Sequence, residues 1–202
     1  LLYDHFPGLL SAALVNSIVQ AIYVYAASFH GKKLLALGGN SGNPIFDWFI
    51  GRELNPRIGE FDIKTFNELR PGLILWALLD ISCVCHQYTK FGWVSDSIVL
   101  VTLFHVWYIV DSLINESTIL TQMDITTDGF GFMLSVGDLA WLPFTYCLQA
   151  RFLAFHPIHL GWLGVLAILA VQFTGYYIFR VANLEKNEFR HGRNPKGTYA
   201  MR

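Results

Sequence analysis

The stretch LTQMDITTDGFGFMLSVGDLAWLPFTYCLQ, residues 120–149, places three aspartates in or beside a segment that is otherwise apolar enough for lipid: Asp124, Asp128 and Asp138. Ionisable side chains are costly at membrane depth, where they usually line the interior of a helix bundle or a water-filled cavity. This stretch therefore decides the fold class, and it is the first place to expect a functional site.

The composition of the whole chain indicates an integral membrane protein. Of its 202 residues, 53% are hydrophobic, 15% aromatic and 14% charged, and the mean hydropathy is +0.41. A soluble domain carries about 25% charged residues. The formal net charge of −1 argues against a nucleic-acid partner. We expect membrane lipids as partners, and no nucleic acid.

Five apolar runs approach the roughly 20 residues that a transmembrane helix needs. They cover about 9–29, 72–88, 97–119, 130–153 and 159–181, and turn-forming Gly and Pro pairs separate them. We predict an all-α fold, a polytopic membrane helical bundle with about five transmembrane helices. The same pattern predicts a single membrane domain over residues 1–202.

The basic residues predict the orientation of the bundle. Six Lys and Arg lie in 30–70 and six more from residue 180 onward, so 12 of the 14 fall in two connections that five spans place on one side. The positive-inside rule makes that side cytosolic, and it places the loop 120–129 there too. We therefore expect 30–70 to be an ordered cytosolic loop and 182–202 a cytosolic tail.

The third run concentrates its polar side chains on one side. At 100° per residue, six of them share an arc of about 140°. This polar arc consists of His105, Tyr108, Asp111, Ser112, Asn115 and Glu116. A single Ser or Asn usually serves as interhelical hydrogen-bond glue. Four ionisable groups together favour function, since membrane proteins retain such groups at depth mainly for that purpose.

Other polar residues allow both structural and functional interpretations. Asp124 and Asp128 share a face if their loop is helical, and Asp138 follows a glycine that permits close backbone approach. Lys186 and Arg190 lie on one helical face with two asparagines and could bind phosphate, but juxtamembrane basic residues more often only set topology. No cysteine or histidine spacing matches a common metal site, so we expect no metal.

Four segments resemble the membrane family of sterol reductases that reduces ring and side-chain double bonds. They are GRELNPRIGEFDIKTFNELRPG (51–72), HVWYIVDSLINE (105–116), DITTDGFGFMLSVGDLAWLPFTYCLQARFL (124–153) and ANLEKNEFRHG (182–192). Within this family, the chain is most similar to the fungal Δ14-sterol reductases of ergosterol synthesis, to which the animal lamin B receptor is homologous.

The resemblance implies an NADPH-dependent enzyme of the endoplasmic-reticulum membrane that saturates the C14=C15 double bond of a sterol. It implies Tyr108 as proton donor, with Asp111 and Glu116 orienting or recharging it. His105, Asn115, Asp124, Asp128 and Asp138 would line the sterol cavity. Lys186 and Arg190 match the family's basic pair at the cofactor phosphates, which favours the functional interpretation of both.

Three alternatives remain at this point. The double bond could instead be Δ7 or Δ24(28). Family members extend further at both ends than this chain, so we expect a fragment truncated at both ends, which could also be a non-catalytic sterol-binding or scaffold homologue. A proton-coupled transporter would use intramembrane carboxylates too, but the one-sided basic residues and the absence of inverted repeats favour an enzyme.

Overall fold

A computed structural model describes residues 2–193, and the chain divides into two compact units, Leu1–Ile158 and His159–Arg202. The second unit contains one long helix, α10 (Gly161–Arg190). Residues 194–202 of the expected cytosolic tail lie outside the described part of the chain. That residues 1–202 make one membrane domain, with a cytosolic loop and tail, stays a prediction.

The first unit is a set of helices with one small two-stranded sheet. Its elements are η1 (Leu2–His5), α1 (Phe6–Ala27), α2 (Pro44–Ile50), β1 (Arg57–Ile58), β2 (Phe61–Asp62), α3 (Ile63–Leu69), α4 (Pro71–Phe91), α5 (Asp96–Ile114), η2 (Glu116–Thr121), α6 (Met123–Thr126), α7 (Phe132–Val136), η3 (Gly137–Trp141), α8 (Leu142–Tyr146) and α9 (Leu148–Phe155). Strands β1 and β2 pair antiparallel, with Ile58 opposite Phe61.

The predicted all-α membrane fold is confirmed. Within residues 2–193, four helices are long and apolar enough to cross a membrane: Leu2–Ala27, Ile63–Phe91, Asp96–Ile114 and Gly161–Arg190. The second begins nine residues earlier than the sequence predicted, because α3 leads into α4 at Arg70. Pro71 starts α4, since a first-turn position needs no backbone N–H.

The expected span at 130–153 forms as consecutive shorter helices and not as one long one. Segments α7, η3, α8 and α9 follow one another from Phe132 to Phe155, and η3 is a single π-helical turn. A π-turn inserts one extra residue and interrupts the regular hydrogen bonding of the α-helix. Four long helices and one segmented helix therefore replace the five spans.

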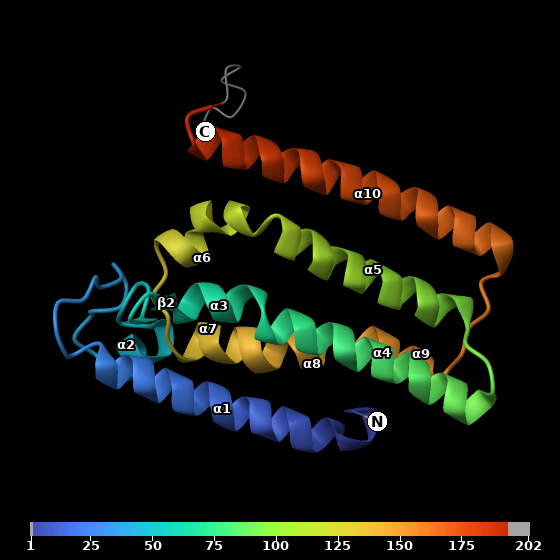
Figure 1. Cartoon of the computed structure of the whole chain (residues 1–202), viewed down its shortest axis with the longest axis horizontal. Helices are drawn as coiled ribbons and strands as arrows, with labels where there is room; N and C mark the ends of the chain where they lie inside the picture. The colour runs from blue at the N-terminus through green and yellow to red at the C-terminus, as the bar shows by residue number, and fades with distance from the viewer. Residues whose placement is uncertain (1, 194–202) are drawn as a thin grey trace. The chain divides into compact units, whose positions relative to one another are not determined.

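Helix α4 is the centre of the first unit, as Figure 1 shows. It packs against α5 on one side and against α8 and α9 on another. The largest apolar cluster joins these helices through Leu73, Trp76, Leu79, Ile109 and Phe144, each at most 5% exposed. At the start of α4, Gly72 lies directly against the backbone carbonyl of Asp138, where a Cβ would collide with it. The π-turn is thus in contact with α4.

A buried amide connects α1 to two other helices. The Gln20 Oε1 atom accepts hydrogen bonds from Asn67 Nδ2 of α3 (2.6 Å) and from Ser135 Oγ of α7 (2.9 Å). Ser135 Oγ also lies 2.9 Å from the backbone oxygen of Ser17. Small residues at such positions allow helices to approach closely, and hydrogen bonds then hold them in register.

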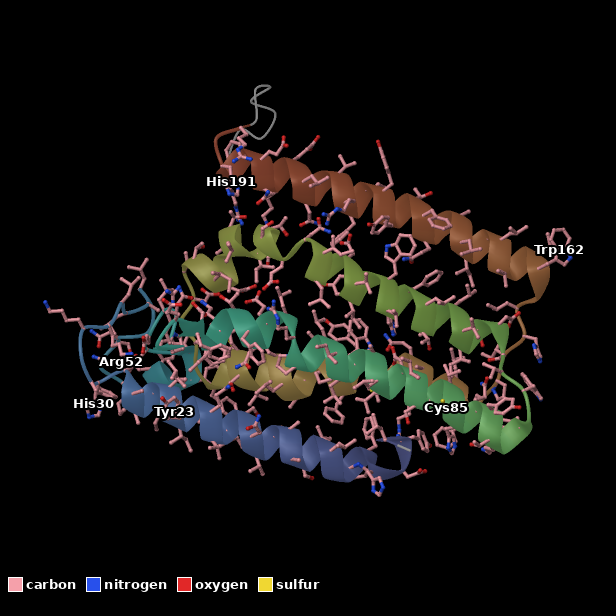
Figure 2. The ribbon with its side chains drawn as sticks, in the orientation of Figure 1. Tyr23, His30, Arg52, Cys85, Trp162 and His191 are labelled. Carbon is pink, nitrogen blue, oxygen red and sulfur yellow. The ribbon has the colours of Figure 1, made fainter. Side chains whose placement is uncertain are left out.

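The connection 28–62 is ordered and gathers at one end of the first unit, where Figure 2 places His30 and Arg52; Cys85 lies farther along α4, toward the other end. Asn43 caps α2 by accepting from Ile45 N and Phe46 N. Asp47 Oδ1 accepts from the backbone N and the hydroxyl of Ser41, at 2.8 and 2.7 Å. These hydrogen bonds lower the pKa of Asp47 below its usual value, so the loop keeps an ionised carboxylate that closes it.

Glycine backbones join this connection to the loop 129–131. A Cβ on Gly51 would collide with the backbone of Gly129, Phe130 and Gly131, and Gly51 has φ +102°. Phe130 N donates to Glu53 O at 3.0 Å beside this contact. Only residues without a Cβ permit such an approach. We call this contact the glycine junction.

Replacing Gly51 with alanine should open the glycine junction. The new methyl group must overlap backbone atoms, and the positive φ adds strain, for a combined loss on the order of 2–4 kcal/mol. Gly59→Ala is the matched control, because Gly59 also has positive φ (+62°) but nothing within 4 Å of its ideal Cβ. Thermal unfolding in detergent should show a clearly larger loss for Gly51→Ala. Equal losses would mean that close packing at the junction contributes nothing.

Candidate functional site

The polar arc of α5 meets a buried aspartate of α4. His105 Nδ1 lies 2.7 Å from Asp80 Oδ2, and the Asp80 side chain is 0% exposed. His105 thus joins α5 to α4 through Asp80. A buried carboxylate is tolerated when it is hydrogen-bonded in this way.

Trp76 places an aromatic surface beside this pair. Its ring lies 4.6 Å from the His105 ring, 6.0 Å from the Tyr108 ring and 5.4 Å from the Tyr146 ring, measured between centroids. Trp76 is buried whereas Tyr108 is 46% exposed within its unit. The arrangement is an apolar, π-rich wall with a phenol at its edge. Such a wall excludes water and can face a positive charge.

The last two residues of the polar arc do not lie on α5. The helix ends at Ile114, so Asn115 is its C-terminal cap and Glu116 opens the 3₁₀ turn η2. The α-helical angle expected for Glu116 is therefore not realised. Asn115 Nδ2 donates to the backbone oxygen of Asp111 (2.8 Å) and to Asp111 Oδ1 (3.2 Å).

Glu116 is paired with an arginine from the start of α4. Arg70 donates two parallel hydrogen bonds to its carboxylate, at 2.6 and 2.7 Å. This bidentate pair lowers the pKa of Glu116 below its usual value, so Glu116 remains a carboxylate at neutral pH. The Arg70–Glu116 pair links η2 to the start of α4.

A buried lysine organises the loop that carries Asp124 and Asp128. Lys64 is 0% exposed, and its Nζ donates to three backbone carbonyls: Leu54 (3.2 Å), Ile125 (3.3 Å) and Asp128 (2.5 Å). An ammonium group has three hydrogens to donate, so every one is used. Lys64 thereby fixes the loop 125–128 relative to the segment at residue 54.

Asp138 belongs to an acidic group that spans three elements. It lies in the π-turn η3 and interacts electrostatically with Glu68 of α3 and Asp124 of α6, and more weakly with Lys64. Single π-turns occur frequently at functional sites. The structure thus brings Asp124 and Asp138 together, while Asp128 belongs with Lys64 through its backbone oxygen.

Lys186 and Arg190 are exposed side chains near the end of α10. Their spacing of four residues puts both on one face of the helix, together with the half-buried Asn183 and Asn187. An ammonium and a guanidinium at this spacing suit a phosphate group. The two residues lie in the second unit.

Sequence reasoning missed four residues that shape the site: Lys64, Glu68, Trp76 and Tyr146. Lys64 was counted among the basic residues of 30–70 that set topology, and Trp76 fell within the apolar run 72–88. One signal was available, because Trp76 and Asp80 stand four apart and so share one face of α4. Within residues 2–193, no three His, Cys, Asp or Glu side chains gather as a metal site would need; the absence of a metal stays a prediction.

The comparison with known proteins identifies the family. A sequence model of the Ergosterol biosynthesis ERG4/ERG24 family matches residues 1–201. The chain belongs to this family.

Curated relatives agree with that assignment. The chain is similar to the Delta(14)-sterol reductase erg24 of Schizosaccharomyces pombe, with 62% identity over 194 residues and 96% of the chain covered. It is similar to the Delta(14)-sterol reductases of Ascobolus immersus (55%, 94% covered) and Saccharomyces cerevisiae (53%, 95% covered). The chain spans about half the length of these relatives, 45–46% of each.

Lys64→Met in this ERG4/ERG24 family member should loosen the loop 125–131. The substitution keeps the length of the side chain but leaves three buried carbonyls without a donor, each costing roughly 1–3 kcal/mol. Amide hydrogen exchange at residues 125–131 should become faster by at least about 10-fold, measured by mass spectrometry.

Arg57→Met is the control for this experiment. Arg57 pairs with Asp62 at 3.1 Å, but its side chain is 60% exposed, so its loss should change stability by less than about 1 kcal/mol. Unchanged exchange in the Lys64 variant would show that the three hydrogen bonds do not hold the loop.

Proposed function

We propose that this chain is the part of a Δ14-sterol reductase that holds most of the sterol cavity and a portion of the NADPH site. The observation that carries the proposal is 53–62% identity to three Delta(14)-sterol reductases over 94–96% of the chain. The geometry around Trp76 and Asp138 supports it, since both places put ionisable groups beside apolar walls.

The chemistry of the proposed reaction requires a positioned acid. Protonation of one carbon of the C14=C15 bond leaves a tertiary cation at the other, which then accepts a hydride. A phenol at the edge of an aromatic, water-poor wall meets both needs. Tyr108 is the group that we assign as donor, because its ring lies against Trp76 on the polar arc.

The remaining site residues are assigned to the walls of the cavity. His105 and Asn115 stand on either side of Tyr108 along the chain, with Asp111 between Tyr108 and Asn115. We assign Asp124, Asp138 and Glu68, which interact electrostatically, to an acidic wall of the cavity, and Asp128 lies in the same loop as Asp124. Glu116 keeps η2 against α4 through Arg70. Its assignment as a group that recharges Tyr108 stays a prediction, as does that of Asp111.

Two residues of this chain, Lys186 and Arg190, have the charge and the spacing to bind the phosphate groups of NADPH. NADPH supplies the hydride when bound. Lys186 and Arg190 are exposed cations on one helical face, so they would hold its phosphate groups, Lys186 as a point charge and Arg190 through its planar fork. Neither side chain moves a proton in this scheme.

The proposed location is the endoplasmic-reticulum membrane. The four long apolar helices make the chain a multi-pass membrane protein. With 30–70 on the cytosolic side, the glycine junction and the loop 125–131 lie on that side as well, because they are in direct contact with it. A cytosolic cofactor would then reach the site from this end.

Tyr108→Phe should abolish most of the turnover. The variant keeps the ring against Trp76 and removes only the hydroxyl, so sterol binding should persist while kcat falls by roughly 10²–10⁴-fold, the usual contribution of a general acid. The assay measures sterol product formed by the protein at its full natural length, with NADPH. Tyr88→Phe, an exposed tyrosine near the end of α4, is the control. Full turnover in the Tyr108 variant would remove Tyr108 as donor.

Reversing the charge of Lys186 and Arg190 should weaken NADPH binding. In the double variant Lys186→Glu/Arg190→Glu, two attractive contacts to phosphate become repulsive, so KM for NADPH should rise at least about 10-fold. KM for the sterol should change far less. Lys90→Glu makes the same kind of change outside the proposed site and should leave both constants unaltered. Equal effects on both constants, or on neither, would contradict the cofactor assignment.

Product analysis distinguishes the alternatives. Mass spectrometry of sterols from a reductase-deficient yeast that expresses the protein identifies which double bond is lost. Loss of Δ7 or Δ24(28) in place of Δ14 would keep the enzyme class and change the substrate. Sterol photolabelling without any consumption of NADPH would identify a non-catalytic sterol-binding or scaffold protein.

A further inference from the structure

The Asp80–His105 pair is a polar contact between two long helices of the first unit. Both partners lie near the middle of their helices, α4 and α5, and the Asp80 carboxylate is 0% exposed. Asp80 Oδ1 has no hydrogen bond of acceptable geometry, although the nearby Trp76 indole interacts with the carboxylate. The carboxylate therefore depends on His105 for its one strong hydrogen bond.

This dependence determines which imidazole nitrogen carries hydrogen. An ionised carboxylate only accepts hydrogen bonds, so with Asp80 ionised the proton on His105 Nδ1 is the donor in the 2.7 Å contact. The other nitrogen, Nε2, is then available for proton exchange. A carboxylate behind a histidine sets tautomer and ring orientation in this way in many sites.

The available nitrogen belongs to a ring that neighbours Tyr108. Residues three apart on a helix have Cβ atoms about 5–6 Å apart. The His105 and Tyr108 rings also contact the same Trp76 ring, at 4.6 and 6.0 Å. The imidazole and the phenol that we assign as proton donor therefore lie on one face of α5 and share Trp76 as a neighbour.

We propose that Asp80 and His105 form a positioning and proton-supply pair for Tyr108, in which Asp80 fixes the imidazole and His105 returns the proton that Tyr108 gives to the sterol. The role rests on the proposed function, because it has a meaning only if Tyr108 protonates a substrate. Neither residue has to touch the sterol.

The proton balance of this step is simple. Tyr108 loses its hydroxyl proton to a sterol carbon and becomes a phenolate. An imidazolium at His105 donates its Nε2 proton to that phenolate oxygen and becomes a neutral imidazole, which keeps its Nδ1 hydrogen on Asp80. A proton taken up from bulk solvent restores the imidazolium before the next turnover, so each turnover consumes one solvent proton. No electrons move, and Asp80 stays ionised throughout.

Other charged groups of the polar arc are less suited to this role. Glu116 is held by two hydrogen bonds from Arg70. Asp111 accepts from Asn115 at the end of α5. His105 is the member of the arc that combines a fixed orientation with a place on the shared Trp76 ring.

Kinetics of Asp80→Asn and His105→Gln test the pair in the protein at its full natural length. Both variants should lower kcat roughly 10- to 100-fold, a part of the 10²–10⁴-fold that a general acid contributes, with KM for the sterol within about 2-fold of the parent. The loss of kcat in the double variant should be no larger than the loss in the more damaging single variant, because the two residues act as one unit. A merely structural role would raise KM or lower the yield of folded protein and leave kcat unchanged.

Thr102→Val is the matched control. Thr102 lies one turn before His105 on α5, is buried, and has a hydroxyl without a hydrogen-bond partner. The substitution is close to isosteric, so kcat should stay at the parent value. If Asp80→Asn behaves like Thr102→Val in a parent that reduces sterol, the proposed pair is wrong while the proposed function stands.

Nitrogen-15 NMR of histidine-labelled protein gives a second readout that needs no turnover. The parent should show a strongly hydrogen-bonded proton on His105 Nδ1, assigned by its absence in His105→Gln, and this proton should move to a weaker hydrogen-bond position in Asp80→Asn. An unprotonated Nδ1 in the parent would overturn the pair. If the parent reduces no sterol at all, the proposed function fails, and the role of the pair fails with it.

Discussion

Three hydrogen bonds from one buried ammonium group hold one end of the proposed site together. Lys64 takes its charge into the protein and uses all three hydrogens on backbone carbonyls at residues 54, 125 and 128. A buried charge without partners would cost several kcal/mol, so those carbonyls and the nearby carboxylates have to be in place whenever the unit is folded. The position of the loop 125–128 and the burial of Lys64 therefore depend on each other.

From this end the first unit continues toward α4 and α5, where the proposed chemistry lies. The loop fixed by Lys64 leads into α7 and then into the π-turn that carries Asp138, whose backbone carbonyl abuts Gly72. Gly72 lies in the first turn of α4, which presents Trp76 and Asp80 about one and two turns later. The acidic wall and the aromatic wall are thus attached to the same short stretch of α4, and a displacement at Gly72 would reach both.

Periodicity predicted what depends on local geometry. The polar side chains from His105 to Ser112 do lie on a single α-helix, and the apolar runs gave the membrane class and the positions of four long helices. The pattern failed where the helix changed type. The sequence predicted Asn115 and Glu116 on the helical arc of α5, but this helix ends at Ile114. The π-turn at Gly137–Trp141, which contacts α4 through Asp138 and Gly72, has no signature in the apolar pattern.

Partners that come from distant parts of the chain could not be read from the sequence. Lys64 was counted among the basic residues that set topology, yet its acceptors lie up to 64 residues away. Trp76 belonged to an apolar run, and only the packing of α4 on α5 reveals the rings that it contacts. Membership of the ERG4/ERG24 family came from matching segments, and these supplied chemical roles that side-chain spacing alone left open.

The glycine junction also has a consequence for biosynthesis. Gly51 contacts Gly129 and Gly131 through the backbone, and roughly 80 residues of synthesis separate the two sides. At about 5–20 residues per second, the connection 28–62 leaves the ribosome roughly 4–16 seconds before its counterpart exists. Ile45, Phe46 and Phe49, which are exposed even in the folded unit, have no junction beside them during that interval. The order of translation thus makes this segment wait for its packing partner before it can take its final place.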